Sequence, residues 1–354
     1  MKVLSVVGAR PQFVKLAPLA RAARADGVDH VIVHTGQHYD PLLSDVFFDE
    51  LGIGPPDVHL GVGSGSHGVQ TGAMLAALDG VIDAHRPDWV LVYGDTNSTL
   101  AAAVSAVKLH VPVAHLEAGL RSFNRRMPEE HNRVLTDHAA DLLLAPTETA
   151  MRHLASEGLR ARSRLVGDVM TDVLLTVRAG VDDRVGDLGE RVGLAVGGYY
   201  LATIHRAENT DDPDRLRGIV SALARLDRPV ILLAHPRVVA RAVAAGVELT
   251  QGSLRAHAPL PYADLIAAAL GSAGVVTDSG GLQKEAFLLG VPCTTVRSET
   301  EWVETVELGW NVLAESPTDI AAAVSRPRPD RTDAAPFGDG HAAERVISIL
   351  RREG

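Results

Sequence analysis

The stretch from residue 89 to 133 contains a pattern that few folds accommodate: a short apolar run, a helical segment, and then the same order again. The first run, WVLVY, ends at Gly94-Asp95, and the second, PVAHL, ends at Glu117. Short, continuously apolar runs that alternate with helices are typical of buried parallel strands and their crossover helices. We therefore expect a parallel sheet in which Asp95 and Glu117 follow the carboxyl ends of strands, where open α/β sheets bind ligands.

The same alternation runs through both halves of the chain, which predicts two doubly wound, Rossmann-like α/β domains. We expect an N-terminal domain at residues 1–170 and a C-terminal domain at residues 171–340, with the helix at 341–354 packing back on the first domain. Apolar runs predict strands at residues 3–7, 30–34, 89–93, 112–116 and 141–146, and then at 200–204, 230–234, 275–277, 293–296 and 311–313.

Composition narrows the classes of partner. Hydrophobic residues make up 46% of the 354 residues and charged residues 22%, so the chain can bury large cores and is not disordered. The formal net charge is −10. Nucleic acid and anionic membranes are therefore not expected as partners, because no excess positive field exists to attract a polyanion.

Cysteine usage and hydropathy set further limits. Cys293 is the only cysteine, so neither an intrachain disulfide nor a zinc–thiolate cluster can form, and no other metal cluster is recognisable. No uncharged run reaches the ~20 residues of a membrane span, and no secretory signal pattern is present. We expect a cytoplasmic protein without metal or membrane association.

Acidic residues gather near the predicted strand ends. Asp95 and Glu117 follow predicted strands, and Glu129 lies at the start of a predicted helix that Pro128 opens. All three lie near arginines in the sequence. Carboxylates beside cationic groups suggest proton transfer on a charged substrate. Helix capping explains Asp95 or Glu129 taken singly, but it is the weaker explanation for three acidic residues at matching places.

The first predicted strand ends in Gly8-Ala9-Arg10-Pro11, and a helix carrying Lys15 follows. Arg10 and Lys15 thus lie at a helix N-terminus, a favourable place for meeting phosphate. Because the turn has no G-x-G-x-x-G pattern, it is not a dinucleotide fingerprint, and no nicotinamide cofactor is expected. For Lys15, a solvated helix face is an equally good interpretation of this segment alone.

The second half offers two further groups. His205-Arg206 follows a predicted strand, although a lone histidine is more often structural than catalytic. Residues 277–285 place Ser279, Gly280 and Gly281 between a strand and a helix, an arrangement suited to a diphosphate, and Glu285 could accept ribose hydroxyls. The alternative is that the glycines only allow tight strand–helix packing.

These motifs, taken in order, resemble the non-hydrolysing UDP-N-acetylglucosamine 2-epimerases over nearly the whole chain. The resemblance implies a glycosyltransferase-B architecture with a ligand cleft between two domains. The markers are residues 8–11 with Lys15, 94–96, 115–121, 128–133, 205–209, and 277–281 with Glu285.

The resemblance also implies a reaction: inversion at C2 of the sugar, without cofactor, by elimination of UDP to a 2-acetamidoglucal and its re-addition. The substrate would be UDP-N-acetylglucosamine or UDP-N-acetylmannosamine, and the protein a homodimer. Catalytic roles fall on Asp95, Glu117, Glu129 and His205. Substrate or UDP binding falls on Arg10, Lys15, Arg133, His235, Pro259, Tyr262, Ser279, Gly280, Gly281 and Glu285.

Two departures from the family pattern bear on regulation and on the sugar. Tyr39 and Ala207 stand where members activated by a second UDP-N-acetylglucosamine carry arginines, so the usual allosteric site is not expected. The stretch 301–307 resembles members that act on modified sugars, including UDP-2,3-diacetamido uronic acids. That substrate is one alternative. A UDP-sugar transferase of the same architecture, a hydrolysing epimerase and a non-catalytic nucleotide-sugar-binding protein are the others.

Overall fold

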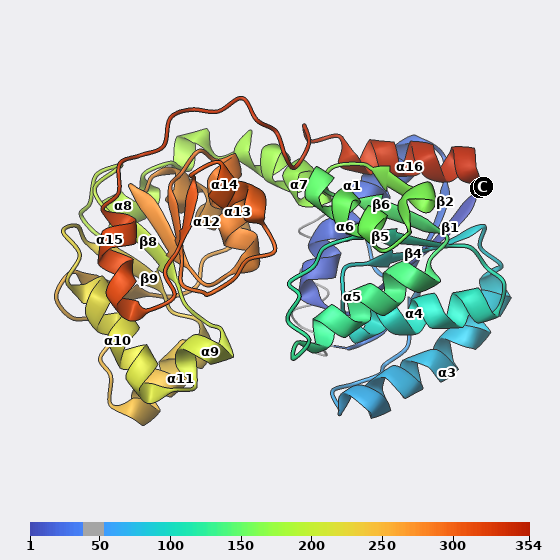
Figure 1. Ribbon diagram of the computed structural model, residues 1–354, viewed down its shortest axis with the longest axis horizontal. Helices are drawn as coiled ribbons and strands as arrows, with labels where there is room; N and C mark the ends of the chain where they lie inside the picture. Colours follow the sequence, from blue (N-terminus) through green and yellow to red (C-terminus); the bar gives the residue numbers. More distant parts are fainter. Residues whose placement is uncertain (38–52) are drawn as a thin grey trace. The chain divides into compact units, whose positions relative to one another are not determined.

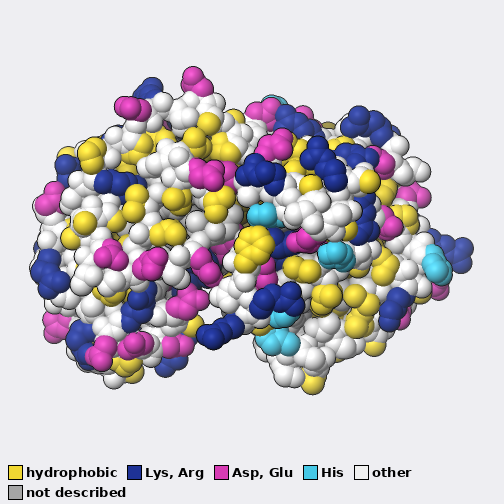
Figure 2. Space-filling model, in the orientation of Figure 1, with side chains coloured by type: hydrophobic (Ala, Val, Ile, Leu, Met, Phe, Trp, Pro, Cys, Tyr) yellow, Lys and Arg dark blue, Asp and Glu magenta, His cyan; other side chains and the backbone are white. Residues whose placement is uncertain are grey.

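The computed structural model describes residues 1–37 and 53–354, so Tyr39 lies outside the described residues. The chain divides into two compact units, Met1–Val173 with Ala335–Gly354, and Leu174–Ala334. The division falls within helix α7, Val169–Arg178. None of the helices in these ranges combines the length and apolar character that a membrane span requires. On the face shown in Figure 2, acidic and basic side chains are interspersed.

In the first unit, the described strands form a parallel sheet in the order β3-β2-β1-β4-β5-β6-β7. Figure 1 labels β1, β2, β4, β5 and β6 of this sheet. The strands are β1 Lys2–Val7, β2 Asp29–His34, β3 Val58–His59, β4 Trp89–Tyr93, β5 Val113–Leu116, β6 Leu142–Ala145 and β7 Ser163–Leu165. The helices, besides α7, are α1 Arg10–Ala25, α3 His67–His85, α4 Asn97–Lys108, α5 Pro128–Ala139, α6 Glu148–Ser156, α16 Ala342–Glu353 and the short η1 Arg160–Arg162.

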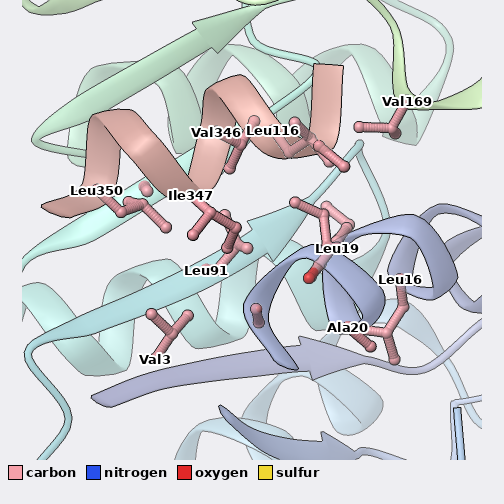
Figure 3. Close-up of a cluster of buried hydrophobic side chains, with 14 of the residues drawn as sticks. Val3, Leu16, Leu19, Ala20, Leu91, Leu116, Val169, Val346, Ile347 and Leu350 are labelled. Atoms are coloured by element: carbon pink, nitrogen blue, oxygen red, sulfur yellow. The ribbon is translucent and has the colours of Figure 1, made fainter. Parts of the chain in front are cut away.

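Both faces of this sheet are covered, which explains its continuously apolar strands. In β1, Val3 and Val7 belong to one buried cluster, whereas Leu4 and Val6 belong to the other. The first cluster lies under α1 and α16 and includes Leu350 of the C-terminal helix (Figure 3). Helix α16 also packs directly against α1, so residues 342–353 form part of the first unit's core.

In the second unit, the described strands form another parallel sheet, in the order β10-β9-β8-β11-β12-β13. They are β8 Tyr200–Thr203, β9 Val230–Leu233, β10 Leu254–His257, β11 Gly274–Thr277, β12 Cys293–Thr295 and β13 Asn311–Leu313. The helices are α8 Asp187–Arg191, α9 Ala207–Thr210, α10 Pro213–Ala224, α11 Pro236–Ala245, α12 Tyr262–Leu270, α13 Gly280–Leu288, α14 Val303–Glu307 and α15 Ile320–Val324, with η2 Asp182–Arg184 and η3 Pro317–Asp319.

The strand orders confirm the expected fold class of two doubly wound α/β units. In the first sheet the order reverses at β1, which pairs with β2 on one side and β4 on the other. In the second sheet it reverses at β8, which pairs with β9 and β11. Ligands of such sheets bind outside the carboxyl ends of the strands at these switch points. The segments after β1, β4, β8 and β11 are therefore the places to look for a functional site.

Candidate functional site

The turn after β1 is held by Gln12, whose importance the sequence did not reveal. Its Oε1 accepts hydrogen bonds from the backbone N–H groups of Gly8 and Ala9, at 2.8 and 3.0 Å, and its Nε2 donates to the Tyr93 carbonyl at 2.8 Å. Gln12 thus joins the carboxyl ends of β1 and β4. Gln12 is the third residue of α1, and the N-cap residue Ala9 has no side-chain acceptor. A glutamine at this position can bond back to the N-cap backbone, and this pattern could have indicated its role from the sequence.

Arg10 is the first residue of α1, and its side chain is not among those described. Lys15, on the second turn of α1, forms an ion pair with Glu117, the residue immediately after β5. Burial lowers the pKa of Lys15, but the adjoining Glu117 carboxylate, with a contribution from Asp95, outweighs burial and raises the pKa above its ordinary value. Lys15 is therefore a charged group of this site and not a solvated side chain on a helix face.

The absence of a side chain at Gly94 leaves space for this ion pair. Its φ is 63°, and a Cβ atom at this position would lie 3.3 Å from Glu117 Oε2 and 3.5 Å from Lys15 Nζ. Glu117 itself has a φ of 66°, a left-handed conformation that costs a non-glycine residue of order 1–3 kcal/mol. Strain of this kind at a buried carboxylate favours a functional role over a purely structural one.

Asp95 follows β4 and is paired with Arg133 of α5. Asn132 of the same helix donates its side-chain N–H to the Asp95 carbonyl at 2.9 Å, so α5 holds both the side chain and the backbone of Asp95. The other guanidinium nitrogen of Arg133 lies 2.8 Å from Glu130 Oε2. Arg133 is almost fully buried, and it therefore fixes two carboxylates at once.

Glu130 organises the loop before α5. Its carboxylate accepts hydrogen bonds from the backbone N–H groups of Ser122 and Phe123, both at 3.0 Å. Burial raises its pKa, but the hydrogen bonds from Ser122, the charge of Arg133 and the Phe123 N–H together lower the pKa below its ordinary value. No role was predicted for Glu130, because its bonds to Ser122 and Phe123 depend on how the preceding loop folds.

Glu129 differs from its neighbour: its side chain is exposed and lines a pocket of about 380 Å³. Asp95 and Asn132 line the same pocket. Other described residues around it are Ala9, Pro11, Gln37, Ser64, Gly65, His67, Gln70, Thr96, Asn97 and Pro128. The predicted residues Lys15, Asp95, Glu117, Glu129 and Arg133 thus come together at the carboxyl edge of one sheet. Carboxylates beside cationic groups can give and take protons from a bound substrate.

In the second unit, His205 follows β8 and its Nδ1 lies 3.0 Å from the buried carboxylate of Asp278, which follows β11. Asp278 also accepts hydrogen bonds from the backbone N–H of Arg206, at 2.9 Å, and from the side chain of Asn209, at 3.0 Å. Burial raises the pKa of Asp278, but His205 and these donors lower it below its ordinary value. The ring of His235 lies 5.6 Å from that of His205.

Ser279 caps α13, its hydroxyl accepting from the Leu282 N–H at 3.4 Å. Gly280 and Gly281 are the first two residues of this helix. A Cβ atom on either glycine would have no neighbouring heavy atom closer than 3.9 Å, apart from the adjoining residues and the helix's own backbone. Tight packing therefore does not require these glycines. They leave open space in front of free N–H groups at a helix N-terminus, which suits an anion.

Glu285 lies on α13 and is mostly buried, and its Oε1 accepts a hydrogen bond from the Tyr262 hydroxyl at 2.8 Å. Tyr262 begins α12, and the exposed Pro259 lies in the loop between β10 and α12. The second unit thus has a histidine–aspartate pair just before α13, an open N-terminus on α13, and a tyrosine–glutamate pair whose glutamate lies on the same helix. Pro259 has no side-chain interaction in this group.

Comparison with known proteins agrees with this arrangement. The family model for UDP-N-acetylglucosamine 2-epimerase matches residues 20–351. A UDP-2,3-diacetamido-2,3-dideoxy-D-glucuronate 2-epimerase from Pseudomonas aeruginosa is 44% identical over 362 residues, covering 99% of this chain and 100% of that protein. A UDP-N-acetylglucosamine 2-epimerase homolog from Methanococcus maripaludis is 43% identical over 358 residues, covering 99% of each chain.

Among solved structures, the UDP-GlcNAc 2-epimerase of Methanocaldococcus jannaschii in complex with UDP-GlcNAc and UDP superimposes with a TM-score of 0.88. Its sequence is 38% identical, and the match covers 99% of this chain and 100% of that one. The two relatives and the solved structure match over 99% of this chain and therefore extend over both units, whereas the family model begins at residue 20. The chain belongs to the UDP-N-acetylglucosamine 2-epimerase family.

Proposed function

We propose that this protein is a non-hydrolysing UDP-N-acetylglucosamine 2-epimerase that interconverts UDP-N-acetylglucosamine and UDP-N-acetylmannosamine. The observation that carries the proposal is the pair of ion-paired carboxylates, Glu117 with Lys15 and Asp95 with Arg133, at the ends of neighbouring strands. A reaction that moves one proton on and off a carbon atom needs such groups, and family membership supplies the substrate class.

The proposed reaction needs no co-reactant, because the proton and the UDP that leave the sugar in the first step are both replaced in the second. A carboxylate removes the proton from C2 of the sugar while the bond between C1 and the UDP oxygen breaks, which gives UDP and a 2-acetamidoglucal. A second carboxylic acid then returns a proton to the opposite face of C2 as the UDP oxygen adds back to C1. Asp95, Glu117 and Glu129 are the groups to which we assign these proton transfers.

Leaving-group stabilisation should lower much of the barrier, because the C2 proton is only weakly acidic. We assign the diphosphate to Ser279, Gly280 and Gly281, on the strength of the open space at the N-terminus of α13. His205, which Asp278 orients, is the hydrogen-bonding partner that we assign to the departing UDP. We assign the uridine to Tyr262 and Glu285, whose side chains already share a hydrogen bond.

A second substrate is favoured by a specific observation. The relative that is 44% identical is a UDP-2,3-diacetamido-2,3-dideoxy-D-glucuronate 2-epimerase. The same chemistry at C2 serves such a sugar, since the substituents at C3 and C6 do not take part in the elimination. We therefore propose this nucleotide sugar as the alternative substrate.

The test is proton NMR in deuterated water with UDP-N-acetylglucosamine or the diacetamido uronate nucleotide, and no acceptor. We expect a new 2-epimer carrying deuterium at C2. Asp95→Asn should abolish the reaction, whereas Asp83→Asn, an exposed change on α3, should leave it intact. Turnover of the uronate nucleotide alone would select the second substrate. Release of free sugar, a requirement for an acceptor, or no reaction would overturn the proposal.

We also propose that the enzyme is a cytoplasmic homodimer that supplies an N-acetylmannosamine nucleotide for cell-surface polysaccharide. The support is family membership together with the sequence-based expectations of a homodimer and of a cytoplasmic location. Light scattering coupled to gel filtration tests the assembly: a mass of one chain at micromolar concentration would contradict it.

A further inference from the structure

His115 and Asp137 form a fully buried pair that the proposed reaction does not use. His115 lies on β5 and Asp137 on α5, and both side chains have no exposed surface. The Nδ1 atom of His115 lies 2.7 Å from Asp137 Oδ1, and its Nε2 atom lies 2.7 Å from the carbonyl oxygen of Gly94. Because a carbonyl oxygen can only accept, Nε2 of His115 donates to Gly94.

The Asp137 carboxylate reaches both sides of Glu117. One oxygen contacts His115, two residues before Glu117, and the other accepts from the backbone N–H of Gly119, two residues after it, at 3.0 Å. The same oxygen lies 2.7 Å from a guanidinium nitrogen of Arg121. One carboxylate therefore closes a loop of five residues around Glu117.

This loop has an unfavourable backbone conformation at its centre. Glu117 has a φ of 66°, which glycine adopts freely but other residues adopt rarely. Gly119 has a φ of 81°, and a Cβ atom there would lie 2.5 Å from the Ala150 carbonyl oxygen. Contacts outside residue 117 must therefore hold its backbone in place, and the bonds from Asp137 do so on both sides.

The turn that carries Asp95 is attached to the same pair. The Gly94 N–H donates to the Leu116 carbonyl at 3.0 Å, and the Gly94 carbonyl accepts from His115. We propose that His115 and Asp137 are positioning residues for catalysis: together they fix the turns that present Asp95 and Glu117 to the substrate. The proposal rests on the epimerase function argued above.

The titratable and charged groups that face the pair come from the same unit. Asp137 faces His115 and Arg121, and Arg121 in turn binds Glu157 through two hydrogen bonds of 2.8 and 2.7 Å. Glu157 also faces His138, at 3.3 Å. Burial raises the pKa of Asp137, but His115 and Arg121 lower it below its ordinary value. Asp137 therefore stays ionised and accepts hydrogen bonds on both oxygens.

The test compares Asp137→Ala with Glu157→Gln in the full-length enzyme. Alanine removes both carboxylate oxygens, so neither His115 nor the Gly119 N–H keeps this partner. We expect kcat per folded molecule to fall by about 100-fold, as misplacement of a reacting group does, while KM and the Kd for UDP change by less than about threefold. Glu157→Gln removes a partner of Arg121 and neither turn contact, so its kcat should stay within about threefold of wild type.

Three results would overturn the proposal: a kcat for Asp137→Ala within about threefold of wild type, a loss fully explained by unfolded protein, or an equal loss in Glu157→Gln. If Asp137→Ala does not fold, His115→Asn decides by the same criteria, because it keeps a donor toward Asp137 and loses the bond to Gly94. Failure of both variants to fold would make the pair purely structural. Failure of the epimerase assignment is separate, since it shows as an inactive wild type.

Discussion

Lys15 and Glu117 form an ion pair that joins α1 to the turn after β5, across 102 positions of the chain. Only 14% of the lysine side chain and 7% of the glutamate side chain are exposed. Desolvation of both charges offsets much of their attraction, so such a pair contributes little net stability, but loss of one partner leaves a buried charge. The pair therefore fixes the position of Glu117 more than it stabilises the fold.

Replacing both residues should consequently cost less stability than the sum of the two single replacements. We expect Lys15→Met to lower the free energy of unfolding of the first unit by about 3 kcal/mol, because Glu117 loses its counter-charge. The double variant Lys15→Met/Glu117→Gln should lose at least about 1 kcal/mol less than the sum of the single changes. Urea unfolding of the four proteins measures this coupling. Additive effects would show that the two side chains do not interact in solution.

Glu130 should give the protein a specific loss of stability in acid. Its pKa lies below the ordinary value of 4.5 in the folded state, so the unfolded chain takes up this proton first as the pH falls. The stability that Glu130 contributes is therefore complete above pH 4.5 and is lost as the pH falls through the folded-state pKa. Glu130→Gln should give a flatter curve of unfolding free energy against pH below that value.

At neutral pH, the same variant should be less stable than wild type by about 1.5–3 kcal/mol, the usual value of charged hydrogen bonds such as that to Arg133. Glu129→Gln is the matched control: this neighbouring side chain is exposed, so the change at pH 7 should stay within about 0.5 kcal/mol. Equal effects of the two variants, measured by urea unfolding, would contradict the structural role of Glu130.

The strands could be predicted from the sequence wherever both faces are buried. The run Trp89–Tyr93 is buried at every position and lies in the structure where the apolar pattern places it. The edge strands β3 and β10 were not predicted. In β10 only Leu254 is buried, and β3 has two residues, so neither presents a continuous apolar run. Asp95 and Glu117 could be placed at strand ends because parallel strands align their carboxyl ends.

The pairing of these groups could not be predicted. Whether Lys15 faces solvent or Glu117 depends on two turns far apart in the sequence, and Gly94 provides the necessary space. The partners Gln12 and Asp278 were also missed, since their side chains bind backbone groups of other segments. Single-sequence patterns report local periodicity and carry no information on such long-range hydrogen bonds.

Gly280→Ala should separate ligand binding from folding. A methyl group there would make only ordinary contacts, at 3.9 Å, with side-chain atoms of Arg206, Gln283 and Glu301, and alanine suits a helix better than glycine. Stability should therefore be unchanged or higher by about 0.5–1 kcal/mol. The methyl group would occupy the space that we assign to the diphosphate, and UDP affinity should fall at least about tenfold, or ~1.4 kcal/mol. Calorimetric titration measures the affinity. Gly72→Ala on α3 is the control, since its methyl group meets no neighbouring atom within 4 Å and should leave UDP binding unchanged.

Regulation by a second substrate molecule should be absent. Ala207, an exposed residue, begins α9 beside Arg206. Neither alanine at position 207 nor tyrosine at position 39 carries the positive charge of an arginine. Charged hydrogen bonds contribute about 1.5–3 kcal/mol each, so two fewer cations should weaken a diphosphate-bearing activator by orders of magnitude. We expect hyperbolic kinetics, and epimerisation of pure UDP-N-acetylmannosamine without a lag. The double variant Tyr39→Arg/Ala207→Arg tests the reason, because it should gain sensitivity to added UDP-N-acetylglucosamine. A wild-type lag that a trace of the gluco isomer abolishes would refute the prediction.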